Sequence, residues 1–255
     1  MKLESIRERF RNLLKGEPEV TVVMPAYNEE ENILRTLSSL SRTITNRSVE
    51  FVIVDNNSKD RTATIVRSTG VICVPETQQG ITPARNAGLR AARGKYILNA
   101  DADTIYPPHW VEQMVKPLDN PAHALCYGRF SFIPLGGTSR LVYFFYEYIA
   151  DLVRYLNKYF REEAVNVYGF NSAFRREQGI EVDGFNHPAE ANEDGWLAMK
   201  LRGKGFGKLY FVTNIKALVW TTDRRLQIDG GFWKAFWKRM VRVITGKRTT
   251  ANNAG

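Results

Sequence analysis

Apolar and polar positions along the first hundred residues fall into blocks that predict strands and helices in turn. Continuous runs rich in β-branched residues, typical of buried strands, cover residues 20–26, 51–55, 71–74 and 95–100. Helical spacing of apolar residues predicts helices over 28–40, after Asp60, and from Thr82 to Gly94. This alternation indicates an α/β fold with a mixed, mostly parallel sheet flanked by helices.

Local signals predict where some of these helices begin and end. Asn28 is a predicted cap of the first long helix, with Glu31 as the residue that reaches back to it. Pro83 suits the first turn of a later helix. Gly16 and Pro18 end a short amphipathic helix predicted at residues 3–15.

Beyond residue 120 the pattern is less regular, but elements are still predicted. Strands are expected at residues 122–133, 166–176, 208–214 and 216–220. Helices are expected at 139–163, at 192–205 with an end at Gly203, and at 230–244. The chain is therefore expected to continue the sheet and to end in a helix.

The composition of the chain indicates which kinds of partner it can bind. The chain has 255 residues with 44% hydrophobic residues and a formal net charge of +9, which suits an anionic partner such as a nucleotide, a nucleic acid or a membrane face. Cys73 and Cys126 lie in apolar runs, so both are expected to be buried free thiols. The N-terminus lacks an apolar signal segment, and no run reaches the ~18 apolar residues of a membrane span. A cytoplasmic protein is expected, with peripheral attachment to the inner face of the membrane as an alternative.

Polar residues follow three of the predicted strands. Tyr27 and Asn28 follow the first, Asp55 ends the second, and Asp101 and Asp103 follow the fourth. Parallel sheets bind ligands outside the carboxyl ends of their strands. Alternate residues of an extended segment point the same way, so Asp101 and Asp103 suit Mg²⁺ or Mn²⁺ held together with a diphosphate. An ordinary surface turn explains this pair equally well when it is taken alone.

Four segments in order carry a more specific pattern: "VVMPAYNEEENI", "VIVDNNSKDRT", "GITPARNAGLRAARGKYILNADAD" and "NEDGWLAMKLRGKG". Together they resemble the inverting family-2 glycosyltransferases, which have the GT-A fold, over roughly residues 20–225. The resemblance implies transfer of a sugar from a nucleotide-diphosphate donor to a glycan or lipid-linked acceptor in cell-envelope or polysaccharide synthesis. Together with the helices predicted at both ends, the expected division is an N-terminal amphipathic helix (1–17), a catalytic domain (18–228) and a basic aromatic helix with a polar tail (229–255). Within the catalytic domain, residues 18–105 form the nucleotide-binding half and 106–228 the acceptor half.

The resemblance also implies roles for the residues on the donor side. Those expected to bind the nucleotide are Pro25, Ala26, Tyr27, Glu29, Asp55, Asn56, Arg85, Asn86, Asp101 and Ala102. Asp103, together with Asp101, is expected to hold the Mn²⁺ or Mg²⁺ ion. Many relatives carry a second aspartate where this chain has Asn56, and an amide differs in its donors and acceptors. This departure puts uracil in doubt, so UDP, GDP and dTDP donors all stay open.

On the acceptor side, the resemblance implies Asp194 as catalytic base and Glu193 as an orienting or acceptor-binding residue. Acids at a helix N-terminus are also favoured by the helix dipole alone. Trp196 is expected near the acceptor. Arg224 and Arg225 suit the diphosphate, because a guanidinium matches phosphate oxygens, although a solvated pair explains them as well.

The predicted C-terminal helix has two faces. Its apolar face carries Phe232, Trp233, Phe236, Trp237, Met240, Val241 and Ile244, and its basic face carries Lys234, Lys238, Arg239 and Arg242. Such a helix either lies in an anionic membrane surface or packs on the catalytic domain or a partner. If the aromatic helix from Leu141 to Phe160 also faces lipid, a lipid-linked acceptor is favoured.

Three other interpretations compete with a glycosyltransferase. A sugar-phosphate nucleotidyltransferase would carry a glycine-rich loop where this chain has "PAYNEE". A nucleic-acid-binding protein would interleave basic and aromatic residues on an exposed sheet or groove helix, whereas the strand ends here are acidic. A pseudoenzyme would bind the nucleotide sugar without turnover, which the presence of Asp101, Asp103 and Asp194 disfavours. His109 and His187 lack partners at metal-ligand spacing and His123 begins a predicted strand, so no histidine metal site is expected. Because the strand ends are acidic, no nucleic-acid partner is expected either.

Overall fold

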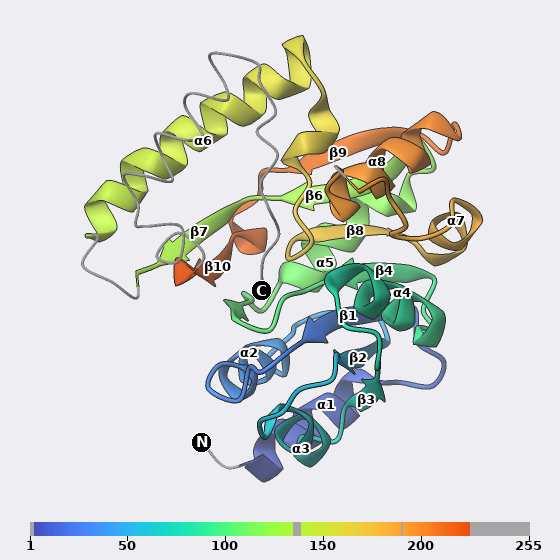
Figure 1. The fold of residues 1–255 in the computed structure, drawn as a ribbon, viewed down its shortest axis with the longest axis vertical. Coiled ribbons are helices and arrows are strands. Elements are labelled where there is room, and N and C mark those ends of the chain that lie inside the picture. The colour runs from blue at the N-terminus through green and yellow to red at the C-terminus, as the bar shows by residue number, and fades with distance from the viewer. Residues whose placement is uncertain (1–2, 135–138, 190, 225–255) are drawn as a thin grey trace.

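The computed structural model describes residues 3–134, 139–189 and 191–224 as two sheets flanked by helices (Figure 1). The larger sheet has the strand order β3-β2-β1-β4-β8-β6-β9. Its strands are β1 (Val20–Ala26), β2 (Val49–Asp55), β3 (Ile72–Pro75), β4 (Tyr96–Asn99), β6 (His123–Gly128), β8 (Ser172–Arg175) and β9 (Lys208–Val212). Only β8 runs antiparallel to its neighbours, β4 and β6. The mixed, mostly parallel sheet predicted from the sequence is confirmed.

A smaller sheet of three strands, in the order β5-β10-β7, stands beside it. Its strands are β5 (Thr104–Ile105), β10 (Val219–Thr222) and β7 (Phe130–Ile133). The single strand predicted at 122–133 is therefore wrong, because this segment forms β6 in one sheet and β7 in the other. The strand breaks where Asn171 packs against Gly128: a Cβ on that glycine would lie 2.4 Å from the Asn171 amide nitrogen. The same amide donates to the Arg129 carbonyl at 2.7 Å.

Helices cover both faces of the larger sheet. They are α1 (Leu3–Leu13), α2 (Ile33–Leu40), α3 (Thr62–Ser68), α4 (Ile81–Ala91), α5 (Trp110–Val115), α6 (Arg140–Phe160), α7 (Arg176–Glu181) and α8 (Glu193–Gly203). Short 3₁₀ turns lie at η1 (Lys116–Asp119), η2 (Glu163–Asn166) and η3 (Ile215–Ala217). Each of these helices is too short or too polar to cross a bilayer.

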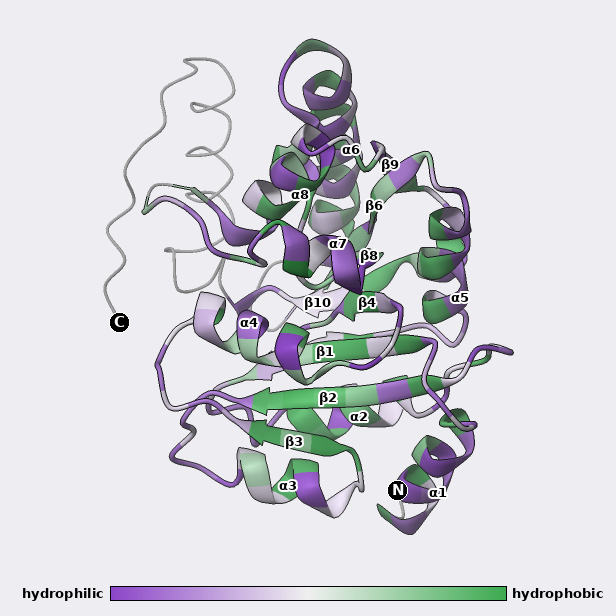
Figure 2. Cartoon of the chain, turned by 90° about the vertical axis from the view of Figure 1, so that its right-hand side faces the viewer, coloured by the Kyte–Doolittle hydropathy of each residue, from purple (hydrophilic) through white to green (hydrophobic). Residues whose placement is uncertain are grey.

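Successive side chains of the central strands point to opposite faces of the sheet and pack into a different core on each face, as the period of two in a strand requires. Val22 and Met24 of β1 pack with α1, α2 and α5, whereas Val23 packs with α4 and α8. Figure 2 shows β1 and β2 as mostly hydrophobic strands with hydrophilic loops beyond them. Their polar ends are thus held rigidly at one edge of the sheet.

The beginning of α2 differs from the prediction. Asn28 does not cap a helix: it has a left-handed φ of 51°, and its side-chain oxygen accepts from the Lys59 N–H at 2.8 Å. The backbone N–H groups of Glu29 and Glu30 are taken by Thr62 and Asp60. Because the loop after β1 is tied to the loop after β2, the helix begins only at Ile33.

The N-terminal helix packs into the core of the protein. α1 is part of the main core, since Ile6, Phe10 and Leu13 are buried and the ring of Phe10 lies 4.7 Å from that of Phe51 on β2. The predicted basic aromatic helix and tail at 229–255 lie outside the described residues. Both cysteines are free, with Cys126 buried and Cys73 half-buried.

Candidate functional site

The carboxyl ends of three strands meet at one edge of the larger sheet. Asp55 of β2 is in register with Ala26 of β1, and β4 pairs with the other side of β1. Asp101 and Asp103 follow β4 directly. One carboxylate oxygen of Asp55 is buried without a hydrogen-bond partner among the described residues. This edge therefore gathers acidic groups, one of which has an unused acceptor.

Arg85 of α4 connects the acidic edge of the sheet to α8. Its Nη2 donates to Asp101 Oδ1 at 2.9 Å, and its Nε lies 3.7 Å from Asp194 Oδ1. The side chain is only 2% exposed and lies over the Phe185 ring. The predicted contact of Arg85 with the nucleotide stays a prediction; in the structure its buried side chain holds a strand-end carboxylate and a helix carboxylate together.

Asp194 sits in the first turn of α8, at a well-formed helix start. The Asn192 side chain caps this helix by accepting from the Gly195 N–H at 3.0 Å. Burial of the carboxyl, which is 5% exposed, raises the pKa of Asp194 to about 7. The charge of Arg85 opposes this shift, while Glu193 adds to it. An acid with this pKa changes protonation near neutral pH, as a general base requires.

Two positioning groups at this site had no signal in the sequence. The backbone of Gly169 hydrogen-bonds the Asp194 carboxylate, and a Cβ there would lie 2.1 Å from Arg85 Nη2. The buried hydroxyl of Tyr106 accepts from the Asp101 N–H at 2.9 Å and donates to the Phe170 carbonyl at 3.1 Å. Burial raises the pKa of Tyr106 well above its ordinary value, so the phenol stays a donor.

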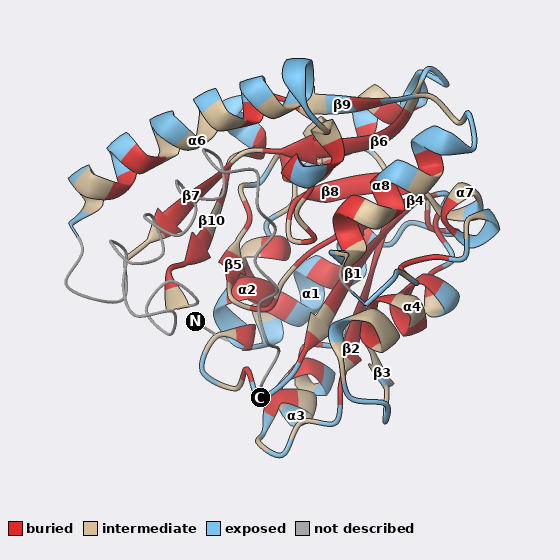
Figure 3. Cartoon of the chain, turned by 45° about the horizontal axis from the view of Figure 1, so that its top comes forward, coloured by how far each residue is buried: buried red, intermediate tan, exposed pale blue. Residues whose placement is uncertain are grey.

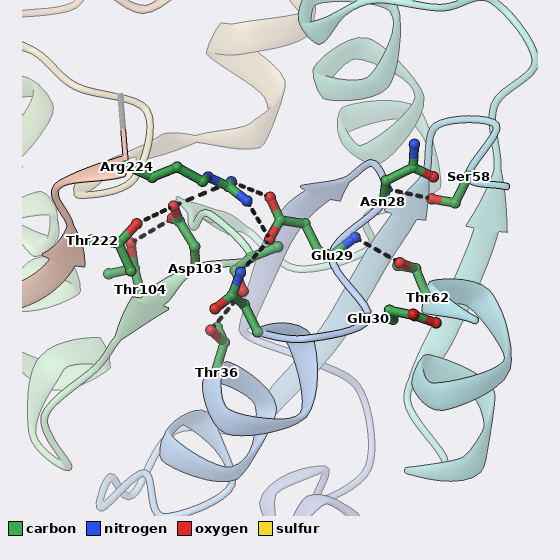
Figure 4. Close-up of polar contacts among 12 residues, drawn as sticks. Asn28, Glu29, Glu30, Thr36, Ser58, Thr62, Asp103, Thr104, Thr222 and Arg224 are labelled. Carbon is green, nitrogen blue, oxygen red and sulfur yellow. Dashed lines mark hydrogen bonds and ion pairs between the residues drawn. The ribbon is translucent and has the colours of Figure 1, made fainter. Parts of the chain in front are cut away.

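Asp103 lies among residues from both ends of the chain (Figure 4). The Thr222 hydroxyl donates to its Oδ2 at 2.7 Å, and Arg224 Nη2 lies 3.4 Å from the same oxygen. Arg224 also makes a two-pronged ion pair with Glu29, one bond of which is 3.2 Å. Arg224 therefore reaches the metal-binding candidate Asp103, and its side chain remains 42% exposed.

The acidic pair after β4 fits a cation that is shared with a ligand. Among the described residues no three His, Cys, Asp or Glu side chains cluster in a way that could hold a metal. Mg²⁺ and Mn²⁺ with nucleotides need only one or two carboxylates, because phosphate oxygens and water complete the shell. Asp101 and Asp103 supply that number of hard donors. The histidines lie elsewhere: His123 bonds the Pro117 carbonyl and His187 bonds Thr82.

Two asparagines predicted to bind the nucleotide have structural partners instead. The Asn56 amide donates to the carbonyls of Glu76 and Gln78, at 3.1 and 2.7 Å. Its oxygen accepts from the Gly80 N–H at 2.8 Å. Asn56 therefore holds the 76–80 loop against the end of β2, and its expected contact with a base stays a prediction.

Asn86 likewise faces the protein. It accepts from the Phe185 N–H at 2.9 Å and donates to the Asn186 side chain at 2.8 Å. It thereby fastens α4 to the loop that precedes α8. The expected contact of Asn86 with the nucleotide stays a prediction.

The other predicted residues are spread around the same edge. Tyr27 is exposed, which suits a ring that stacks on a base. Ala26 and Ala102 are buried, and the Ala102 carbonyl accepts from Thr36. The half-buried ones are Pro25, Glu193 and Trp196. Arg225 lies outside the described residues.

This chain is similar to known glycosyltransferases. The sequence profile of glycosyl transferase family 2 matches residues 21–178, more than half of the chain. Glycosyltransferase AglE of Haloferax volcanii is 33% identical over 130 residues, which are 48% of this chain and 43% of that protein. A dolichol-phosphate mannosyltransferase of Mycosarcoma maydis is 31% identical over 114 residues, 40% of this chain and 39% of that protein. The chain thus spans less than half the length of these curated relatives.

Solved structures show the same fold. A mannosyltransferase from Pyrobaculum calidifontis, in complex with GDP-Man and Mn²⁺, has a TM-score of 0.61 and 22% identity over 93% of this chain and 71% of that one. Glucosyl-3-phosphoglycerate synthase from Mycobacterium tuberculosis, in complex with Mn²⁺, UDP and phosphoglyceric acid, has a TM-score of 0.60 and 20% identity over 98% and 84%. The expected GT-A fold is therefore confirmed. Given the profile match, this chain belongs to glycosyl transferase family 2.

Proposed function

We propose that this protein is an inverting, divalent-cation-assisted glycosyltransferase that uses a UDP-, GDP- or dTDP-sugar. Its acceptor is a hydroxyl of a glycan or of a lipid-linked saccharide, in cell-envelope or polysaccharide synthesis. One observation carries the proposal: Arg85 holds the donor-side Asp101 and the helix acid Asp194 in one buried contact. Structural neighbours with bound GDP-Man or UDP-GlcNAc support a nucleotide-sugar donor.

In this proposal the chemistry is a single displacement at the anomeric carbon. Asp194 takes the proton of the acceptor hydroxyl while its oxygen bonds to the sugar and the bond to the diphosphate breaks. Attack opposite the leaving group inverts the configuration. Asp101 and Asp103 would hold the cation, which when bound neutralises charge on the departing diphosphate. Arg224, partly exposed beside Asp103, is placed to meet phosphate oxygens.

The rival functions have less support. A nucleotidyltransferase would need a phosphate loop after β1, but the backbone from Asn28 to Glu30 is bonded to the 58–62 loop. A nucleic-acid-binding surface would meet a sheet edge lined by Asp55, Asp101 and Asp103, which repels phosphate unless a cation lies between them. Membership of glycosyl transferase family 2 agrees with the transferase.

A panel of nucleotide sugars tests the proposal, scored for Mn²⁺-dependent hydrolysis and for thermal stabilisation. We expect one donor class to stabilise the protein. Asp103→Ala should lose metal-dependent donor binding, because it removes a cation ligand, and Asp194→Asn should keep donor binding and lose transfer. If Asp194→Asn transfers sugar at the parental rate, Asp194 is not the base.

A further inference from the structure

The outer face of α6 is an extended apolar surface. Only Tyr143, Tyr146 and Arg154 are buried among its 21 residues, and Figure 3 shows exposed positions recurring along its whole length. The exposed apolar side chains are Leu141, Phe144, Phe145, Tyr148, Ile149, Leu152, Tyr155, Leu156, Tyr159 and Phe160. A continuous apolar face of this size calls for a partner.

The spacing of this face suits another helix. Six of the exposed residues follow one another at alternating steps of four and three: Leu141, Phe145, Tyr148, Leu152, Tyr155 and Tyr159. Steps of four and three form the seam through which two helices pack side by side. The segment beyond the described residues repeats these steps at Trp233, Trp237, Met240 and Ile244. The two stripes are therefore matched in pattern.

The path of the chain also brings the start of the segment after residue 224 close to α6. The last described strand, β10, lies against the beginning of the helix: the Tyr143 hydroxyl donates to Asp223 Oδ2 at 2.5 Å. The Arg140 guanidinium lies 5.2 Å from the ring centre of Trp220. Residues 225–231 can span about 23 Å when extended, and a helix over 232–244 would be about 20 Å long. The exposed stripe of α6 is about 27 Å long. A linker over 225–231 can therefore reach the stripe, and a helix over 232–244 fits along it.

The charges of α6 argue against a lipid surface as its primary partner. A helix that binds anionic lipid carries cations beside its apolar face. The three cations of α6 already have carboxylate partners: Arg140 pairs with Glu147, Arg154 with Asp151 and Lys158 with Glu163. Tethering also favours the chain's own segment over a second copy, because a short linker provides an effective concentration of the order of millimolar.

We propose that residues 232–244 form a helix that packs its apolar face on the exposed face of α6. In this arrangement Trp233 and Trp237 lie against the aromatic side chains of α6. The basic face, with Lys234, Lys238 and Arg242, then points to solvent as a ridge beside the catalytic domain.

Photocrosslinking in the full-length protein tests this proposal. Tyr148 is replaced by p-benzoylphenylalanine, and a mixture of ¹⁵N-labelled and unlabelled chains is irradiated without lipid and analysed by mass spectrometry. We expect an adduct within one chain to a peptide from 229–245. Adducts only between chains would show a second copy on α6 and overturn the proposal. No adduct to this segment in buffer, with adducts to vesicles of phosphatidylcholine and phosphatidylglycerol, would show a lipid contact and overturn it as well.

Matched variants show whether the apolar face of residues 232–244 packs on α6 or whether the segment only passes near the probe. Trp237→Lys with Ile244→Lys should lower the yield of the adduct by about tenfold, because two apolar contacts are lost. Lys238→Ser with Arg239→Ser, on the opposite face, should leave the yield unchanged. Equal yields from both double variants would contradict the proposed orientation. The same probe at exposed Ile180 on α7, away from α6 in Figure 1, should give no adduct to 229–245.

Discussion

At the scale of single residues, burial gives Asp194 a property that few carboxylates have. Its pKa of about 7 means that the carboxyl is protonated in mildly acidic solution, where it could not act as the base that we propose. We expect kcat/KM to fall about tenfold for each pH unit below 7, since the rate follows the ionised fraction. Initial rates between pH 5 and 9 at saturating donor would measure this.

Glu193 provides the control for that profile. Its charge helps to raise the pKa of Asp194, so Glu193→Gln should move the midpoint to lower pH whatever it does to the maximal rate. A profile that is flat down to pH 5 in the parent protein would contradict the role of burial.

A second expectation concerns the tight packing at Gly169. A methyl group there would lie 2.6 Å from Asp194 Oδ2 and 2.1 Å from Arg85 Nη2, so both charged groups must move. Displacement of a catalytic group by about 1 Å can cost on the order of 100-fold in rate. We expect Gly169→Ala to lose about that factor in kcat, measured by a transfer assay, with near-native circular dichroism.

Gly203 is a matched control, because a Cβ there meets nothing within 4 Å. Gly203→Ala should therefore keep the parental kcat. Equal rates for Gly169→Ala and the parent would show that Asp194 and Arg85 are not held as tightly as their distances indicate.

The sequence predicted the acidic residues of the site better than their supports. Asp101, Asp103 and Asp194 lie in sequence motifs, and these motifs were enough to identify them as candidates. Arg85 lies in a motif too, but the position of its side chain depends on burial by segments about 85 and 100 residues later in the chain, Gly169 and Phe185. Such contacts between distant segments leave no periodic trace in a sequence.

At the scale of elements, α8 also holds the loop that precedes it. Lys200 Nζ donates to the carbonyls of Asp183, Gly184 and Asn186 at 3.2, 2.7 and 3.0 Å. Lys200→Met would remove the donor of all three carbonyls; the Gly184 carbonyl is the most enclosed of them, and a buried bond left unmet costs about 1–3 kcal/mol. If the loop binds the acceptor, the acceptor KM should rise about tenfold or more while the donor KM is unchanged.

Lys204 at the end of the same helix is the control. Its ion pair with Glu181 is formed by two exposed side chains, and exposed pairs contribute little. Lys204→Met should therefore leave both KM values as they are. A matching rise in donor KM for Lys200→Met would instead indicate a general disturbance of the site.

The elements themselves were predictable to different degrees. Buried parallel strands such as β1 and β2 produce long apolar runs, so their positions were predicted within a few residues. The division of residues 122–133 into β6 and β7 was not predictable. It depends on Asn171, whose amide bonds Arg129 and whose oxygen accepts from Trp110, all far apart in the chain.

At the scale of the whole molecule, stability and activity should separate at α1. Phe10 is buried against Phe51 on a part of β2 remote from the acidic edge. Phe10→Ala should lower the free energy of unfolding by about 3–5 kcal/mol, because it leaves a cavity. Urea denaturation measures this loss, and kcat at low temperature should be unchanged. Leu14→Ala, at an exposed position of the same segment, should lower stability by less than about 0.5 kcal/mol.

The bond between Thr222 and Asp103 has a consequence for the order in which this protein matures. Its partners are separated by 119 positions, so a chain emerging from the ribosome completes the β1–β4 half long before the threonine exists. Domains form from the N-terminus onward during synthesis. A product cut short before β10 would therefore lack the Thr222 hydroxyl that bonds Asp103, and Arg224 with it, so its acidic edge would be unfinished.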